Sequence, residues 1–397
     1  MKRLNVCIVT FLLCFNFGVS QNNTQEYNKE LELILGGNII LNSGSEKIDI
    51  ISDLDNGLCV KINIKGKDYI FLFDTASSVS VINSNIVDIG QTSSKITTID
   101  NFGNENDLDL YILDFKIGQN TFKNFAFIQK DLTNIQLNTC LNIDGIIGIN
   151  VLKKLNWKLI KNEKSLYFSK ENFDYARFYE PLPIKWFNNL VPLIELFKNN
   201  SSFYVAIDTG YFGTVKLSQE NYNSFDNNYK QLVKGNGFPF HSIENKIKTE
   251  LRKSKVNDLN FKNGLNLNNY EIIIDNSKPL LGKKILFNDN LILNFLNDEI
   301  SFGKDFNSQK NNHNDLNFKI CKSEKNNNEI ELCFFWQNDN NKNLKVGDKI
   351  IQIDEIRTDN ISNSDYCELL NYIKNRDKVN VIFQRGKKQF MNIINLN

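Results

Sequence analysis

The chain has 397 residues, more than one ordinary hydrophobic core organises, so two or three domains are expected. Its apolar fraction of 41% and charged fraction of 23% are typical of a soluble globular protein. The formal net charge of +1 excludes the strong field that attracts nucleic acid or an anionic membrane, so neither is expected as a partner.

The N-terminus has the pattern of a secretory signal. Lys2 and Arg3 precede an apolar stretch at 6–17, and small residues follow up to Ser20. This order is typical of a signal peptide, and the apolar stretch is shorter than a typical membrane span. We expect residues 1–20 to be removed on export and no membrane span to remain. A buried N-terminal helix is the alternative.

Cysteine usage favours a bacterial envelope protein. Five cysteines remain without the signal, whereas exported eukaryotic proteins of this size are more often rich in disulfides. We therefore expect a periplasmic, outer-envelope or secreted bacterial protein. We expect the cysteines to be mostly small buried side chains, and a bridge between Cys59 and Cys140, which lie in the same expected half, is the alternative. The cysteine and histidine spacing indicates no metal, so no metal and no cofactor are expected.

A β pattern begins after a connector at 21–50, whose position alone would also suit a removable pro-segment. Residues 58–64 alternate between apolar and polar, 65–68 predict a hairpin turn, and the next strand runs into Asp74. Further elements are expected in order: strands at 113–117 and 122–129, a short helix at 150–155, and a hairpin of 158–160 with 165–169.

The following part of the chain repeats this order. Strands at 190–197 and 202–207 lead to Asp208, and 259–267 resembles 113–122 in sequence. A short helix at 283–287 and a hairpin of 291–294 with 299–302 complete the repeat. A repeated unit of this length indicates a duplicated half rather than a solenoid.

A polar linker at 304–317 separates these halves from a third domain at 318–397. Gly347 and Asp348 predict a turn before a buried strand. An amphipathic helix is expected at 364–375, capped by Ser362 or Ser364, and a final hairpin joins 379–384 to 389–394.

Two Asp-Thr motifs end equivalent strands. The first is Asp74-Thr75-Ala76 and the second is Asp208-Thr209-Gly210. Each Asp is followed 74 residues later by the glycine of an apolar-apolar-Gly element, at Gly148 and Gly282. Two carboxyls that face each other across a pseudo-two-fold axis cannot both ionise, so they share a proton and can activate water.

These motifs resemble those of the retropepsin/pepsin-like aspartic proteases over residues 50–303. The resemblance implies a mainly β, two-lobed fold of pepsin/retropepsin-like β-barrels, with lobes at 51–180 and 181–303. It implies that Asp74 and Asp208 are the catalytic dyad. It also implies that Thr75 and Thr209 interlock, that Gly210 lets the backbone approach the dyad, and that Gly148 and Gly282 support it from behind.

Two features of the motifs depart from the family pattern. Ala76 stands where glycine is usual, and Tyr211 follows Gly210 where alanine or serine is usual. The hairpin around Gly103 falls where the family has its substrate-covering flap, and residues 235–238 are the candidate counterpart in the second lobe.

The C-terminal segment resembles a PDZ domain, a small α/β fold, through residues 344–350 and the helix after them. The resemblance implies capture of a peptide C-terminus by strand addition. The carboxylate-binding loop typical of these domains is not visible near 318–333, so a docking role stays open beside peptide capture. An unrelated small α/β module is the further alternative.

The leading hypothesis is an exported, monomeric aspartic endopeptidase that acts on peptide or protein substrates. Two lobes in one chain remove the need for a homodimer. The alternative is a peptide-binding envelope protein that keeps a protease-like fold without activity. A duplicated β domain whose two Asp residues only cap turns is the structural alternative.

Overall fold

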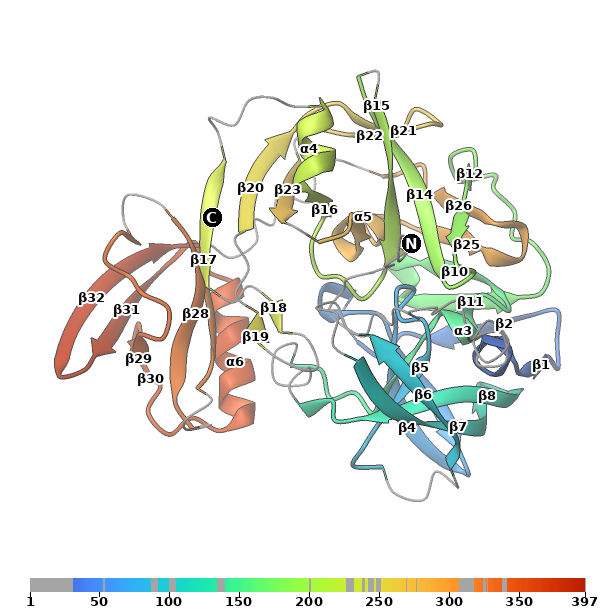
Figure 1. Cartoon of the computed structure of the whole chain (residues 1–397), viewed down its shortest axis with the longest axis horizontal. Helices are drawn as coiled ribbons and strands as arrows, with labels where there is room; N and C mark the ends of the chain where they lie inside the picture. The colour runs from blue at the N-terminus through green and yellow to red at the C-terminus, as the bar shows by residue number, and fades with distance from the viewer. Residues whose placement is uncertain are drawn as a thin grey trace.

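The computed structural model shows a mainly β protein, as expected from the sequence (Figure 1). The signal, residues 21–30, Gly103, Phe238 and most of the expected linker lie outside the described residues. Within the described part, no helix is both long and apolar enough to cross a membrane. The structure describes residues 31–52, 54–86, 92–99, 105–133, 140–199, 201–225, 232–237, 240–241, 246–247, 251–268, 270–275, 277–306, 318–323, 326, 328–337 and 341–396.

The first half of the chain, residues 31–180, contains a closed six-stranded β-barrel. Its strand order is β8-β5-β9-β4-β3-β7, and pairing of β7 with β8 closes the ring. Phenylalanines from β7 and β8 fill the interior, with the rings of Phe115 and Phe122 stacked at 4.8 Å. The strands of this half are β1 (Asn38–Ile40), β2 (Ser45–Asp49), β3 (Cys59–Ile64), β4 (Lys67–Phe73), β5 (Ser80–Asn83), β6 (Thr92–Ile99), β7 (Glu105–Ile117), β8 (Asn120–Lys130), β9 (Gly145–Ile147), β10 (Asn156–Ile160) and β11 (Ser165–Ser169).

The second half, residues 181–306, repeats the same pairings. β15 pairs in parallel with β24 as β4 does with β9, and β16 lies between β24 and β23 as β5 lies between β9 and β8. The repeat is less regular, because β20 and β21 stand where the first half has the single long β7. The strands here are β12 (Leu182–Pro183), β13 (Lys185–Phe187), β14 (Val191–Lys198), β15 (Ser201–Asp208), β16 (Val215–Ser218), β17 (Val233–Gly237), β18 (Phe240–His241), β19 (Lys246–Ile247), β20 (Leu251–Val256), β21 (Leu259–Phe261), β22 (Asn266–Leu267), β23 (Tyr270–Asp275), β24 (Leu280–Gly282), β25 (Leu291–Asn294) and β26 (Glu299–Phe302).

A six-stranded sheet of order β12-β26-β25-β10-β11-β2 joins the two halves. The hairpins β10–β11 and β25–β26 have equivalent turns, each with a 3-10 turn and then a left-handed residue, Lys164 or Asp298. β10 and β25 pair with each other, so one hydrophobic core runs through both halves. Strands β1 and β2 lie within the expected connector and pair with β8 and β11. The short helices are η1 (Leu54–Asn56), α3 (Ile149–Leu152), η2 (Lys161–Glu163), α4 (Gln219–Phe225), α5 (Lys283–Leu286) and η4 (Phe295–Asn297).

The C-terminal unit, residues 318–396, has a hydrophobic core of its own. The expected helix forms as α6, and Ser362 caps it by accepting a hydrogen bond from the Asp365 N–H. Tyr366, Leu369 and Ile373 form its buried face. The elements are β27 (Phe318–Lys322), β28 (Ile330–Trp336), β29 (Lys349–Ile353), β30 (Ile356–Arg357), α6 (Asn363–Lys374), β31 (Lys378–Arg385) and β32 (Lys388–Asn395).

The disulfides differ from the expected pairing. Cys140 bonds Cys367 of α6, Cys321 bonds Cys333, and Cys59 is a buried free thiol. The candidate bridge between Cys59 and Cys140 is therefore wrong, and so is the view that the cysteines are mostly unbonded core side chains. Cys59 lies on β3 in the core of the first half, whereas Cys140 packs against the core of the C-terminal unit.

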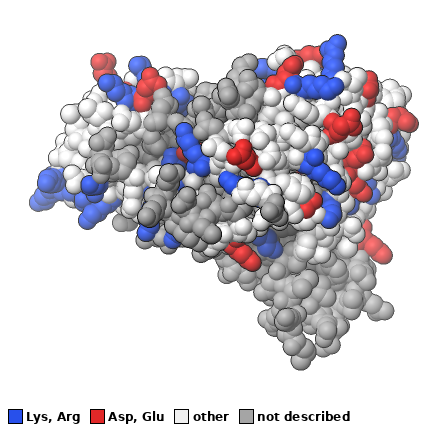
Figure 2. All heavy atoms as spheres, turned by 90° about the horizontal axis from the view of Figure 1, so that it is seen from above, with Lys and Arg blue, Asp and Glu red and all other residues white. Residues whose placement is uncertain are grey.

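Charged side chains of both signs intermingle over the described part of the face in Figure 2. This mixture agrees with the net charge of +1 and with the absence of a strong one-sign field in the sequence.

Gly148 is a point at which two backbone segments pack closely. A Cβ there would lie 2.7 Å from the Ser77 carbonyl oxygen and 2.8 Å from the Val79 carbonyl carbon. We predict that Gly148→Ala lowers the free energy of unfolding by about 1–3 kcal/mol, because backbone atoms have to move. Gly44→Ala is the matched control, since a Cβ at Gly44 meets nothing within 4 Å. Equal urea-unfolding midpoints for both variants would contradict this packing.

Candidate active site

Both Asp-Thr turns lie at the ends of interior strands. Asp74 follows β4, which lies between β3 and β9, and Asp208 ends β15, which lies between β14 and β24. The Asp74 N–H donates to the Ile147 carbonyl at 3.0 Å, which ties the first turn to β9. Neighbours on both sides therefore fix each strand end before its turn begins.

The two turns interlock through their threonines. The Thr75 hydroxyl donates to the Ile207 carbonyl at 2.7 Å, and the Thr209 hydroxyl donates to the Phe73 carbonyl at 2.8 Å. Each hydroxyl also accepts the backbone N–H of the opposite threonine, at 3.1 and 3.0 Å. These reciprocal bonds place each Asp beside the turn of the other half.

Each of the Asp74 and Asp208 carboxyls has one oxygen bonded to its own turn and one oxygen without a protein partner in the described part of the chain. Asp74 Oδ1 accepts the Ala76 N–H at 2.9 Å, and Asp208 Oδ1 accepts those of Gly210 and Tyr211 at 2.9 and 2.8 Å. Both residues are 0% exposed, and neither Oδ2 has a hydrogen-bond partner among the described residues. One oxygen of each carboxyl therefore has no hydrogen bond from the described protein and can carry or share a proton.

The turn that carries Gly210 lies against Asp74. A Cβ at Gly210 would be 2.5 Å from Asp74 Oδ2, so only glycine fits beside this carboxyl. The equivalent position in the first turn is Ala76, which is buried and carries a methyl group. The two halves of the site are thus similar in backbone but unequal in the space around the two carboxyls.

Burial dominates the electrostatics of the pair. It raises the pKa of Asp74 to about 7, against the opposing effect of the Ala76 and Ser77 N–H groups. Burial and then the charge of Asp74 raise the pKa of Asp208 well above its ordinary value, while the Tyr211 N–H, the Lys216 ammonium and the Gly210 N–H lower it. Two adjacent buried carboxyls that resist ionisation hold at least one proton at neutral pH.

A buried cation beside the second turn was missed by the sequence reasoning. Lys216 is 2% exposed, lies 3.8 Å from Asp275, and has its ammonium 5.7 Å from the centre of the Tyr211 ring. The residue at the same distance from Asp74 in the first half is Ile82. A lysine between Val215 and Leu217 was the available signal.

The remaining predicted residues surround the two turns. Gly148 follows β9, which pairs with β4, whereas Gly282 ends β24 and pairs there with Asp208. The Gly282 N–H donates to the Thr214 carbonyl at 2.6 Å. Tyr211 packs against Gly213 and Gly282, so its ring lies within its own half.

The two flap candidates have different outcomes. Gly103 lies outside the described residues. In the second half, Gly235–Gly237 of β17 pair with β28 of the C-terminal unit rather than forming a free hairpin edge, and Phe238 is not described.

One group of potential metal ligands occurs among the described residues: Cys321, Glu331 and Cys333. The two cysteines are bonded to each other, and the group lies in the C-terminal unit rather than between the Asp-Thr turns.

Comparison with known proteins finds no match, either to a protein-family model or to a curated protein. The geometry of the site therefore carries the functional argument alone.

The threonine hydroxyls give a first prediction for the site. Thr209→Val keeps the side-chain shape but removes the bond to Phe73 and leaves the buried Thr75 N–H without its acceptor. We predict a loss of about 3 kcal/mol in the free energy of unfolding. Thr209→Ser retains the hydroxyl and is expected to cost about 1 kcal/mol. Equal losses in chemical unfolding would show that the interlock does not stabilise the fold.

The raised pKa of Asp74 gives a second prediction. A carboxyl whose pKa is raised on folding stabilises the fold fully below its unfolded value near 4, and this contribution is lost as pH rises through about 7. Asp74→Asn stays neutral, so it should match the wild type near pH 4 and exceed its stability by roughly 3–4 kcal/mol above pH 7. A stability difference that does not change with pH in thermal or urea unfolding would contradict the buried pair.

Proposed function

We propose that this chain is an aspartic-type endopeptidase that hydrolyses peptide bonds with water held between Asp74 and Asp208. The observation that carries the proposal is the pair of buried carboxyls on equivalent turns, each with an Oδ2 that lacks a protein hydrogen bond. The Gly210 turn lies against Asp74 Oδ2, and the charge of Asp74 raises the pKa of Asp208, so the two carboxyls act on each other as a pair.

The reaction uses one shared proton. The ionised carboxylate accepts a proton from the water as its oxygen attacks the peptide carbonyl carbon, and the protonated carboxyl donates a hydrogen bond to the carbonyl oxygen. The resulting tetrahedral species collapses when the carboxyl that took the proton from water passes it to the leaving nitrogen, which breaks the C–N bond and restores the single shared proton. Burial supports this chemistry because it keeps one carboxyl protonated near neutral pH, where an exposed Asp is ionised.

The fold supports the same assignment. A duplicated strand order, two interlocking Asp-Thr turns and a sheet shared by both halves suit a two-lobed pepsin/retropepsin-like enzyme, with the lobes proposed at 51–180 and 181–303. Both acidic groups come from one chain, so we propose a monomer. The signal-like N-terminus supports export from a bacterial cell.

We propose a PDZ-like fold for the C-terminal unit and a docking role in preference to peptide capture. Two observations support docking: β28 pairs with β17 of the second half, and Cys367 is bonded to Cys140 of the first. In addition, the Tyr366 hydroxyl of α6 donates to the Ile320 carbonyl, which ties the helix to β27.

A second candidate function is peptide binding without hydrolysis. The observation that favours it is the complete burial of both carboxyls, since a substrate reaches them only if the halves move. Assays of peptide cleavage and of peptide binding distinguish the two candidate functions.

The test is cleavage of a peptide library between pH 3 and 8, followed by mass spectrometry. We predict that Asp74→Asn and Asp208→Asn each lower kcat/KM by at least about 10³-fold, because either change removes the shared-proton pair. Asp131→Asn is the matched control, an exposed carboxyl whose Oδ1 accepts from Thr133 of its own turn. Cleavage that persists in either dyad variant would exclude the mechanism. Peptide binding without cleavage by the wild type would favour the second candidate.

A further inference from the structure

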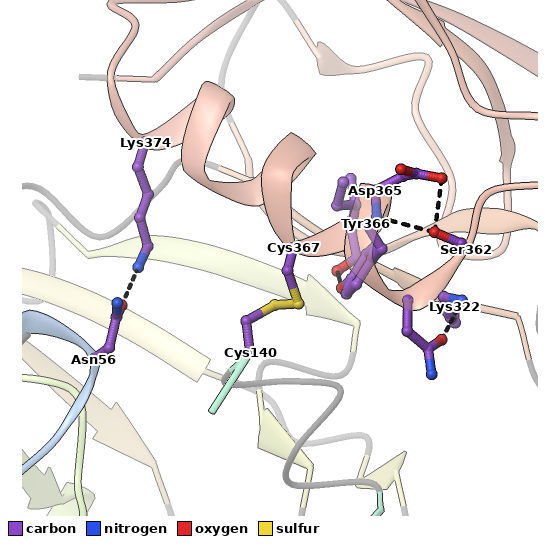
Figure 3. Close-up of a disulfide and its surroundings, with 10 residues drawn as sticks. Asn56, Cys140, Lys322, Ser362, Asp365, Tyr366, Cys367 and Lys374 are labelled. Carbon is purple, nitrogen blue, oxygen red and sulfur yellow. Dashed lines mark hydrogen bonds between the residues drawn. A yellow bond between two sulfur atoms is a disulfide. The ribbon is translucent and has the colours of Figure 1, made fainter. Parts of the chain in front are cut away.

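Helix α6 of the C-terminal unit contacts the first half at two points. Cys367 is bonded to Cys140, and the Lys374 ammonium donates to the Asn56 side-chain oxygen at 2.9 Å (Figure 3). Cys367 and Lys374 are seven residues apart, so two helical turns place them on the same face of α6. One face of one helix therefore contacts two segments of the first half.

Both contacts adjoin a small cluster between the halves. Asn56 precedes Gly57, and Cys140 precedes Leu141. A Cβ at Gly57 would lie 3.3 Å from Leu141 Cδ1 and 4.0 Å from Cζ of Phe212, which belongs to the second half. Gly57 thus lies between Leu141 of the first half and Phe212 of the second, directly beside the contacts of α6.

Phe212 connects this cluster to the proposed dyad. It follows Tyr211, whose N–H donates to Asp208 Oδ1. The ammonium of Lys283, the residue after Gly282, lies 3.4 Å from the centre of the Phe212 ring. A displacement of the first half at Gly57 and Leu141 therefore acts on the turn that holds the Asp208 carboxyl.

The C-terminal unit is also bound to the second half. β28 pairs with β17, and the Gln337 N–H donates to the Lys234 carbonyl at 2.8 Å. Phe334 and Trp336 form a hydrophobic cluster with Leu251 and Ile273 of the second half. The unit is therefore linked to the first half by a disulfide and to the second by strand pairing. Figure 1 shows β28 beside β17.

We propose that the disulfide between Cys140 and Cys367 is a redox-sensitive lock that holds the two halves closed over the dyad. The inference rests on the proposed function for its effect on hydrolysis. With the bond intact, α6 fixes the segments that pack on Phe212, and both carboxyls are 0% exposed. When the bond is reduced, the first half separates from α6 and a peptide reaches the dyad.

The reductant is a dithiol. One of its thiolates attacks Cys140 or Cys367 and forms a mixed disulfide, and its second thiol then displaces the protein sulfur. Two electrons and two protons pass to the protein, which leaves two cysteine thiols and one oxidised dithiol.

Exposure makes this bond the more accessible of the two disulfides. Cys140 and Cys367 are half-buried, whereas Cys321 and Cys333 are each 2% exposed. Cys140 also has a φ of 54°, a left-handed conformation that side chains other than glycine rarely adopt.

The test compares the full oxidised chain with Cys367→Ser and Cys140→Ser. The matched control is the double variant Cys321→Ser with Cys333→Ser, which removes a disulfide internal to the C-terminal unit. The readouts are kcat/KM on a cleaved peptide and hydrogen exchange at 54–59, 140–147 and 208–213. If folding of a variant fails, wild-type protein reduced with dithiothreitol and alkylated replaces it.

We expect each lock variant to raise kcat/KM about tenfold, because loss of the bond shifts molecules from the closed state to an open state that is a minor population in the oxidised protein. Exchange should rise in the three segments, while the control stays at the wild-type values. Unchanged exchange in both lock variants, or a fall in kcat/KM, would overturn the lock. Faster exchange without cleavage by any form supports the lock and refutes the proposed peptidase.

Discussion

The reciprocal hydrogen bonds of Thr75 and Thr209 are the contact on which the site depends. Each hydroxyl donates to the residue before the opposite Asp and accepts from the opposite threonine, so neither turn is positioned by its own half alone. This arrangement holds two carboxyls where their ionisation is unfavourable. The same arrangement leaves one oxygen of each carboxyl without a protein partner. Burial of the two carboxyls therefore lowers the stability of the fold near neutral pH, and it does so at the groups that share a proton in the proposed reaction.

The duplication has not produced two equal halves. The first half closes its barrel with one long strand, while the second divides the equivalent strand and pairs β17 with the C-terminal unit. Near the dyad, Ala76 of the first half corresponds to Gly210 of the second. Lys216 stands where the first half has Ile82. The buried Lys216 ammonium lowers the pKa of Asp208, whereas the equivalent position in the first half is Ile82. The asymmetry gives the two carboxyls different surroundings, which is a physical basis for different roles.

The sequence predicted what depends on local pattern. Alternation located β3 and β4, the Asp-Thr spacing located the two turns, and apolar periodicity located α6 within one residue of each end. It did not predict the bond between Cys140 and Cys367, because 227 residues separate them and cysteine spacing alone does not determine pairing. The pairing of β17 with β28 was missed for a related reason, since an edge strand is compatible with several partners.

The most direct test of the account is the protonation state of the two carboxyls. Carbon-13 chemical shifts of the Asp74 and Asp208 side chains, followed by NMR from pH 3 to pH 9, report it without requiring a substrate. The account predicts that the pair retains a proton at pH 6 and that the two groups titrate as a coupled pair. Two independent titrations near pH 4, the ordinary range for exposed aspartates, would contradict the shared proton and the peptidase assignment with it.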